Sequence, residues 1–445
     1  MSLMSLLAFA PVFSGYAQTP GQGESAHIGP WSLSECIDYA LSNNITVKQQ
    51  DITVKQKAID LNTAICDRLP NLSGGVSQNL SFGRGLNAQN AYVNTNTSST
   101  GFDLGSTASL FNGFRAYQTI KLDQINLKAA TADLDKAKND IRMNVAQAYV
   151  QILYDMEILD VSKRQVSIDS LQVERLKAML ASGKASSVEV SQQEATLAQS
   201  RYTDIQASNN LKLAVLGLTQ LLEFPSPEGF SVVRPVVSGD VCLISSPDDI
   251  YAQAVSSRPD IMAEQYRLQG SEVNIRIAKS ALYPSLSLSA GLGSNYYKSS
   301  GVNAANFREQ LNNNFSQYVS LSLNIPIFNK FATRNSIRGA ELSRQSQWLQ
   351  LENAKKSLYK EIQQAYYNAV AAQGKFIGSK QAVQSAEESF KLVSSKYENG
   401  KANITEFNES KNNYLKSESD YVQSLYEFIY QSKLLDFYKG LPLAL

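Results

Sequence analysis

The chain has 445 residues, of which 41 are basic and 40 acidic, for a net charge of +1. Such a balance offers no basic field to hold nucleic acid by counterion release, so nucleic acid is not an expected partner. The three cysteines, Cys36, Cys66 and Cys242, have neither the number nor the spacing of a disulfide framework or a zinc site. We expect three small buried apolar residues, with Cys36 and Cys66 on one helix.

The first 17 residues read MSLMSLLAFAPVFSGYA, a short apolar stretch that ends in small residues. The stretch is too short to span a bilayer, and it is typical of a secretory signal peptide (residues 1–17), here followed by an N-terminal extension (residues 18–31). No Lys or Arg precedes the apolar run, so a disordered N-terminus is the alternative. Because Gln18 follows the expected cleavage point, a lipid-anchored N-terminus is not expected.

The segment from residue 32 to Pro70 has a helical pattern, which changes at RLPNLS (68–73). After Pro70, apolar or small residues alternate with polar ones, and the alternation returns before Phe111. A period of two over about ten residues is typical of a membrane-spanning β-strand, with lipid on one face and water on the other. We therefore expect strands at about 71–83 and 100–111 and a long Asn-rich loop near 84–99. A half-buried sheet in a soluble protein is the alternative.

No proline occurs from residue 114 to residue 224, and apolar residues recur there at coiled-coil spacing. This seam consists of Leu134, Ala137, Ile141, Val145, Ala148 and Ile152. The stretch can hold a helix of about 65 residues, roughly 100 Å long. Gly183 is expected to end it, because glycine readily takes the left-handed conformation found after helix C-termini. A second helix then returns along the first.

A second repeat (residues 248–440) follows the first (residues 32–222) after a Pro- and Gly-containing linker (residues 223–247), and a tail (residues 441–445) ends the chain. Pro284, in LYPSLSLS (282–289), lies 214 residues after Pro70, and Gly400 lies 217 residues after Gly183. The seam recurs at the offset of 217 as Leu351, Ala354, Leu358, Ile362, Ala365 and Ala369. We expect strands at about 285–297 and 317–328, with a loop near 298–316. The chain is therefore a duplicated helix–strand–strand–long helix–helix unit.

Four membrane strands cannot close a barrel, because open edges in lipid leave backbone groups unpaired at several kcal/mol each. Eight strands are the usual minimum, so copies of the chain must associate. Two copies supply eight strands and three supply twelve, and parity does not choose between them. Aromatic residues near the strand ends are expected to form interfacial girdles: Phe82, Phe102, Tyr296, Tyr297, Tyr318 and Phe328.

Four segments resemble the TolC family of outer-membrane efflux proteins: WSLSECIDYALSNNITVK, SRPDIMAEQYRLQGSEVNIRIAKSALYPSLSLSAG, LASGKASSVEV and YENGKANITEF. The resemblance covers residues 32–440. It implies an α+β membrane protein that forms a homotrimer, with a 12-stranded β-barrel continuous with a 12-helix α-barrel tunnel. It also implies location in the outer membrane of a Gram-negative bacterium, with most of the mass in the periplasm.

By the same resemblance, the function is that of an exit duct for a tripartite efflux pump or a type I secretion system. The implied partners are a periplasmic adaptor (membrane fusion protein), an inner-membrane transporter of the resistance-nodulation-division or ABC type, and outer-membrane lipid. The pump partner largely sets the cargo, and that partner is another chain.

The resemblance also implies roles for residues near the two turns. Glu406 and Glu409, spaced i, i+3, match acidic residues that face the lumen at the gate. Glu189 and Tyr397 match an acidic and an aromatic residue that link neighbouring helices in the closed state. The basic partner expected at position 402 is absent, since Ala402 stands there. The turn residues are the implied docking surface for an adaptor: Leu180, Gly183, Val190, Gly400 and Phe407.

No catalytic motif and no cofactor or metal motif occurs, and the single histidine, His27, lies in the N-terminal extension. The sequence therefore predicts a protein that is not an enzyme. The competing hypotheses are a structural periplasmic coiled-coil or adaptor protein, which would lack the paired strands, and a passive porin or a secreted enzyme.

Overall fold

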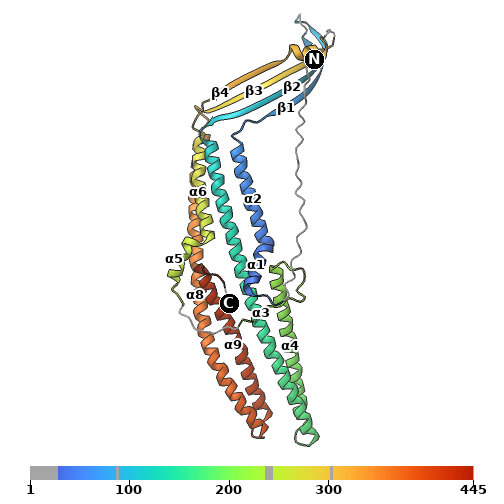
Figure 1. The fold of residues 1–445 in the computed structure, drawn as a ribbon, viewed down its shortest axis with the longest axis vertical. Helices are drawn as coiled ribbons and strands as arrows, with labels where there is room; N and C mark the ends of the chain where they lie inside the picture. Colours follow the sequence, from blue (N-terminus) through green and yellow to red (C-terminus); the bar gives the residue numbers. More distant parts are fainter. Residues whose placement is uncertain (1–28, 87–89, 236–243, 301–303, 444–445) are drawn as a thin grey trace.

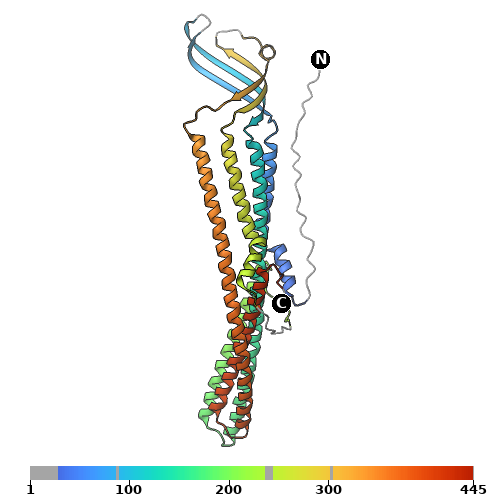
Figure 2. The same cartoon turned by 90° about the vertical axis from the view of Figure 1, so that its left-hand side faces the viewer.

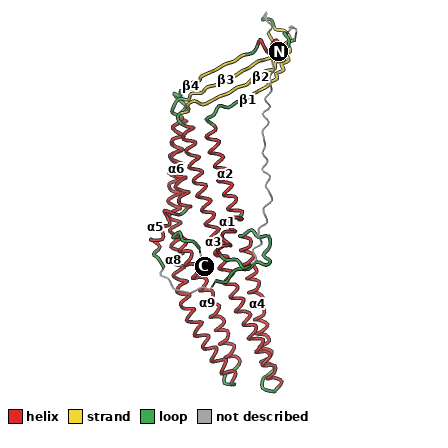
Figure 3. The backbone as a smooth tube through the Cα atoms, in the orientation of Figure 1, coloured by secondary structure: helices red, strands yellow, loops and turns green. Residues whose placement is uncertain are grey.

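The structure is a computed structural model that describes residues 29–86, 90–235, 244–300 and 304–443. The expected signal peptide, most of the 18–31 extension, His27 and Cys242 lie outside the described residues. Figure 1 shows an elongated protomer with a sheet at one end and long helices running to the other. The strands are confined to the sheet end (Figure 3). None of the described helices combines the length and the hydropathy needed to span a bilayer.

The two halves of the chain contain matching helices of equal length. Helices α1 (Leu33–Asn43) and α5 (Pro247–Ser257) have 11 residues each, and α2 (Ile45–Cys66) and α6 (Pro259–Ser280) have 22 each. The long helices α3 (Arg115–Ala181) and α8 (Ala332–Glu398) have 67 residues each, and the returning helices α4 (Ser187–Leu221) and α9 (Ile404–Tyr438) have 35 each. The duplicated unit expected from the sequence is confirmed.

Four strands form one antiparallel sheet: β1 (Ser73–Leu86), β2 (Tyr92–Asn112), β3 (Ser285–Ser299) and β4 (Ser316–Asn324). Their order in the sheet is β1-β2-β3-β4, so each repeat supplies one hairpin and β1 and β4 are the two edges. Pro70 lies between α2 and β1, and Pro284 lies between α6 and β3. Both prolines therefore stand where a helix gives way to a strand.

The expected loop near 84–99 is wrong, because most of it is strand. β1 continues to Leu86 and β2 begins at Tyr92, and these two residues pair in the ladder. The polar side chains of this region form hydrogen bonds across the strands, as when Gln78 Nε2 donates to Ser98 Oγ at 2.9 Å. Such cross-strand bonds stabilise a sheet that has few apolar contacts.

The second strand pair also differs from expectation. β4 ends at Asn324 instead of continuing to about 328. The next positions include Pro326, which has no N–H to donate to the ladder. The expected loop near 298–316 contains a short helix, α7 (Phe307–Asn313).

A break at Asn44 separates α1 from α2, so Cys36 and Cys66 do not share one helix as expected. Asn44 caps α2, since its side chain accepts a hydrogen bond from the Thr46 amide at 2.9 Å. Its side-chain amide also donates to the Leu221 carbonyl at 3.0 Å, which ties the break to the end of α4. Cys36 is buried, but Cys66 is exposed on the last turn of α2, against expectation.

Helices α2, α3, α6 and α8 lie side by side beneath the sheet in that order (Figure 2). In the other half of the molecule, α3 packs on α4 and α8 packs on α9. The seam residues Leu134, Ile141, Val145 and Ile152 lie in the largest buried apolar cluster, where α1, α3, α4 and α9 meet. Their counterparts in α8 form a second cluster with α5, α6 and the end of α9: Leu351, Leu358, Ile362, Ala365 and Ala369.

Candidate gate at the helical tip

The tip of the molecule consists of two turns of the same design. Gly183 and Gly400 both have φ of +70°, in the left-handed region where glycine carries no steric penalty. After each glycine, the next amide reaches back five residues: Lys184 N–H donates to the Met179 carbonyl, and Lys401 N–H donates to the Lys396 carbonyl, both at 2.8 Å. This is the bonding pattern that closes a helix C-terminus.

Glu189 and Glu406 occupy equivalent positions after the two turns, as the third residue of α4 and of α9. Ser186 caps α4, and its N–H donates to the Glu189 carboxylate at 2.7 Å, which lowers the pKa of Glu189. Asn403 caps α9 by accepting the Glu406 amide at 2.9 Å, and its side-chain amide donates to the Glu406 carboxylate at 3.3 Å. Each carboxylate therefore stabilises the start of its own helix.

Glu406 and Glu409 are both exposed on α9. Phe407, between them in the sequence, is buried and points into the protein. Within the described part of the chain, no salt bridge is formed by either carboxylate. One chain brings two carboxylates to this face, so a ring of charge requires further copies.

Tyr397, near the end of α8, contacts α3 and α9. Its hydroxyl accepts a hydrogen bond from the Gln172 side chain of α3. The Arg175 guanidinium lies 5.0 Å from the centre of the Tyr397 ring, and the Phe407 ring centre lies 4.9 Å away. Burial raises the pKa of Tyr397. In this structure Glu189 turns back to cap α4, and Gln172 is the hydrogen-bond partner of the Tyr397 hydroxyl. The expected link between Glu189 and Tyr397 in the closed state stays a prediction.

A buried polar network lies further from the tip and joins α3, α4 and α9. Asp169 of α3 and Lys411 of α9 form an ion pair, and both side chains are fully buried. Ser200 of α4 donates to Asp169 at 2.5 Å, and Gln193 of α4 donates to Asp169 at 3.3 Å. The Asn408 side chain of α9 donates from Nδ2 to the side-chain oxygen Oε1 of Gln193 at 3.0 Å, which completes the network.

This network was not expected from the sequence, although the sequence contains a signal for it. Lys411 stands at an apolar position of α9, four residues after Phe407 and four before Leu415, and both of these are buried. A charged residue at such a position needs a partner, because an unpaired buried charge is strongly unfavourable. The signal indicates that a partner exists but not which residue it is.

Of the expected docking residues, Leu180 is partly exposed and the two turn glycines are exposed. Val190 and Phe407 are instead buried between helices, so their side chains are not accessible to a partner in this conformation, and docking at the turns stays a prediction. Phe407 packs against Tyr397 and Phe390, as a core residue does.

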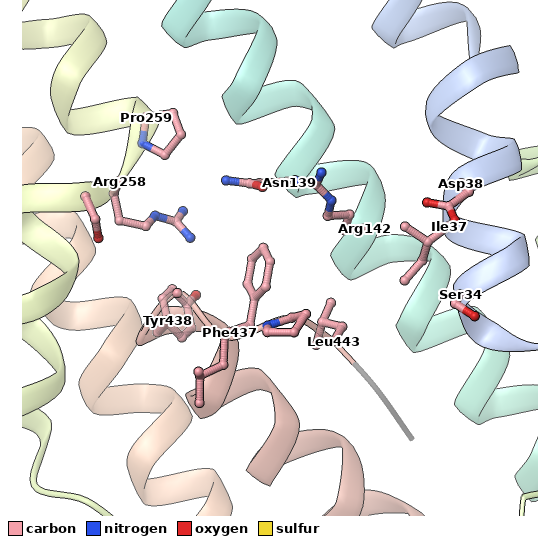
Figure 4. A pocket seen from close by; sticks show the side chains of 14 residues that line it. Ser34, Ile37, Asp38, Asn139, Arg142, Arg258, Pro259, Phe437, Tyr438 and Leu443 are labelled. Atoms are coloured by element: carbon pink, nitrogen blue, oxygen red, sulfur yellow. Dashed lines mark hydrogen bonds between the residues drawn. The ribbon is translucent and has the colours of Figure 1, made fainter.

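A cavity of about 550 Å³ lies far from the tip, between α1, α3, α6 and the end of α9. Figure 4 shows Arg258 extending into it beside Tyr438, and the guanidinium lies 5.3 Å from the Tyr438 ring centre. Arg142, on the opposite side, bonds Asn139 at 2.6 Å. Within the described ranges, no group of three or more His, Cys, Asp and Glu side chains is placed to bind a metal.

Residues 36–222 and 250–437 match the family model described as outer membrane efflux protein. The chain belongs to that family. The probable outer membrane lipoprotein SilC of Salmonella typhimurium is 23% identical over 345 residues, covering 74% of this chain and 68% of SilC. The protein CyaE of Bordetella pertussis is 24% identical over 445 residues, covering 94% of this chain and 86% of CyaE.

Among solved structures, CusC superposes with a TM-score of 0.77 at 18% identity, over 92% of this chain and 91% of that one. A curated CusC, the cation efflux system protein of Escherichia coli O157:H7, is 25% identical over 374 residues, covering 78% of this chain and 73% of CusC. The expected family, the fold of the duplicated unit and the outer-membrane location are confirmed. The protein is an outer-membrane exit channel of the efflux and secretion type, and the adaptor hypothesis is not supported.

Proposed function

We propose that three copies of this chain form a closed duct, with twelve strands in the outer membrane and twelve helices below them. The observation that carries this proposal is that β1 and β4 are open edges of a four-stranded sheet. Unpaired strand edges are not tolerated in lipid, so β4 of one copy must pair with β1 of the next.

The helices support the same association. α2 and α8 are the two ends of the helix layer, and each carries apolar residues at intervals of seven that no other described element covers. These residues are Ile45, Ile52 and Ile59 on α2 and Leu342 and Leu349 on α8. Exposed apolar stripes of this kind mark a surface that packs against another chain. The same two ends would meet when β4 pairs with β1 of a neighbour.

In this proposal the duct serves a tripartite efflux pump or a type I secretion system. An inner-membrane transporter, of the resistance-nodulation-division or ABC type, supplies the energy, and a periplasmic adaptor docks at the tip through Leu180, Gly183 and Gly400. Relatives named for cation efflux and for toxin and drug export are in keeping with such partners. We also propose that residues 32–222 and 248–440 act as two repeats joined by the 223–247 linker, after removal of residues 1–17.

The gate in this proposal consists of Glu406 and Glu409, which three copies would assemble into a ring of six carboxylates. Such a ring attracts cations and is blocked by multivalent ones. Tyr397 contributes to closure through Gln172, and Glu189 contributes by holding the start of α4. The Asp169–Lys411 pair holds α9 against α3 and α4 behind the gate.

The proposal is tested by extracting the full chain from outer membranes in detergent, measuring its mass, and inserting it into a planar bilayer. We expect a trimer that conducts ions. A chain that remains monomeric after extraction, or a trimer without conductance under any applied voltage, would overturn the proposal.

A further inference from the structure

Apolar side chains are exposed at all four places where a helix meets a strand. The loop between β4 and α8 is the clearest case, with Ile327 94% exposed and Phe328 and Phe331 also exposed. The other three junctions add Leu69, Leu72, Phe114, Tyr117, Leu282 and Tyr283. We call these exposed residues the apolar belt. Exposed apolar and aromatic residues of this kind mark a surface that meets lipid or protein.

The same junctions are strongly basic. Segments 66–72, 113–123, 275–284 and 325–338 contain 8 basic and 2 acidic residues, although the whole chain has 41 and 40. We call the basic residues the basic collar: Arg68, Arg115, Lys121, Arg276, Lys279, Lys330, Arg334 and Arg338. The two acidic residues are Asp67 and Asp123. The charge balance of the chain is therefore uneven, with its positive excess gathered beside the sheet.

No side chain of the basic collar forms an ion pair or a hydrogen bond with another described residue, whereas Arg344 and Arg267, further along the helices, are both paired with carboxylates. Seven of the eight collar residues are exposed, and Lys121 is half-buried. The fold therefore leaves these charges available to an anionic partner.

Arg334 lies on the face of α8 that packs against α5. Tyr359 lies 25 residues after Arg334, close to seven helical turns, so the two share a face of α8. That face carries α5, since the Tyr359 hydroxyl donates to Asp248 at 2.9 Å and its ring contacts Tyr251 at 5.1 Å. α5 lies at the left of the helices in Figure 1, and the sheet extends toward the right. In the proposed ring, this face of α8 would lie outside the tunnel.

We propose that the basic collar binds the anionic headgroups of phospholipids in the membrane leaflet next to the helices. The apolar belt would enter the acyl region while the long Arg and Lys side chains reach the phosphates, as cations at membrane boundaries do. This inference rests on the proposed membrane duct and adds a lipid class to it. The collar would set the depth of the barrel and keep the helices upright beneath it.

The experiment uses the full chain purified in nonionic detergent and stripped of lipid. Phosphatidylglycerol or phosphatidylcholine with the same acyl chains is titrated in, and native mass spectrometry counts the bound lipids. Each Lys or Arg near an anionic membrane surface changes the affinity for that surface by about fivefold. The double variant Arg334→Gln with Arg338→Gln should therefore reduce the preference for phosphatidylglycerol over phosphatidylcholine by at least that factor. The preference should also fall at high salt.

The matched control is Arg201→Gln with Lys212→Gln, which removes two exposed, unpaired charges from α4. This control should keep the full preference. Equal binding of the two lipids by the unaltered chain, or an equal loss in both double variants, would overturn the proposal. Displacement by inorganic phosphate at the same concentration would identify a free-phosphate site instead and would also overturn it. The oligomeric mass in detergent and the conductance in a planar bilayer are measured on the same samples. They show separately whether the proposed duct is wrong.

Discussion

Lys411 of α9 and Asp169 of α3 form a fully buried ion pair between residues 242 positions apart in the sequence. Because Ser200 and Gln193 of α4 also bond Asp169, the pair fastens the α8–α9 hairpin to the α3–α4 hairpin. Any opening that separates the two hairpins must carry this pair into water or break it. The packing of the two hairpins therefore depends on polar groups inside the protein as well as on apolar contacts.

Lys411→Met should destabilise the closed tip strongly. It leaves the Asp169 carboxylate buried without its partner, a change that costs about 3–5 kcal/mol. We expect a lower temperature of thermal unfolding and a larger resting conductance in planar bilayers.

Two companion variants sharpen the Lys411 test. Lys411→Met with Asp169→Leu should recover much of the loss, because replacing both buried charges by apolar groups is often neutral. Lys391→Met breaks an exposed pair with Glu387 and should change little. If Lys411→Met and Lys391→Met behave alike, the buried pair does not hold the hairpins together.

Tyr397→Phe should weaken the closed state moderately by removing the hydrogen bond from Gln172 while keeping the ring contacts. The expected loss is about 0.5–1.5 kcal/mol. Gln172→Leu should have a similar effect, and the double variant should lose little more than either single one, as measured by thermal unfolding in a double-mutant cycle. Strong coupling of Tyr397→Phe to Glu189→Ala instead would return Glu189 to the role first expected for it.

Glu406→Gln with Glu409→Gln should reduce cation preference and block by multivalent cations. Glutamine at position 406 keeps the helix cap, because Gln serves at the third helical position as Glu does, so charge is removed without loss of the cap. Single-channel reversal potentials in a salt gradient measure the effect. Glu228→Gln, in an exposed loop far from the tip, is the control. Unchanged selectivity in the double variant would exclude the two residues from the gate.

Gly400→Ala should destabilise the second turn by about 1 kcal/mol, because alanine is strained at a φ of +70°. No atom lies within 4 Å of an added Cβ, so the effect comes from the backbone alone. Gly374→Ala, in the middle of α8 and equally unobstructed, should stabilise instead by up to about 1 kcal/mol. Thermal unfolding compares the two, and the same sign of change in both would contradict the argument.

The sequence by itself determined the duplicated order of elements, the junctions at Pro70 and Pro284, and the ends of the long helices at Gly183 and Gly400. These features depend on the backbone preferences of single residues and on the spacing of apolar residues, which are local properties. The need for several copies in the proposed duct also follows from the sequence, because four strands cannot close a barrel. The extent of β2 was not foreseeable, since its polar residues are stabilised by hydrogen bonds to β1.

Only the tertiary structure decided which polar residues meet. Lys411 at an apolar position indicates a buried partner, but Asp169 is 242 residues away and becomes that partner through the packing of α3 on α9. Tyr397 likewise bonds Gln172 instead of Glu189, because Glu189 has a cap to form on its own helix. Contacts between helices depend on their relative rotation and height, which local sequence patterns do not specify.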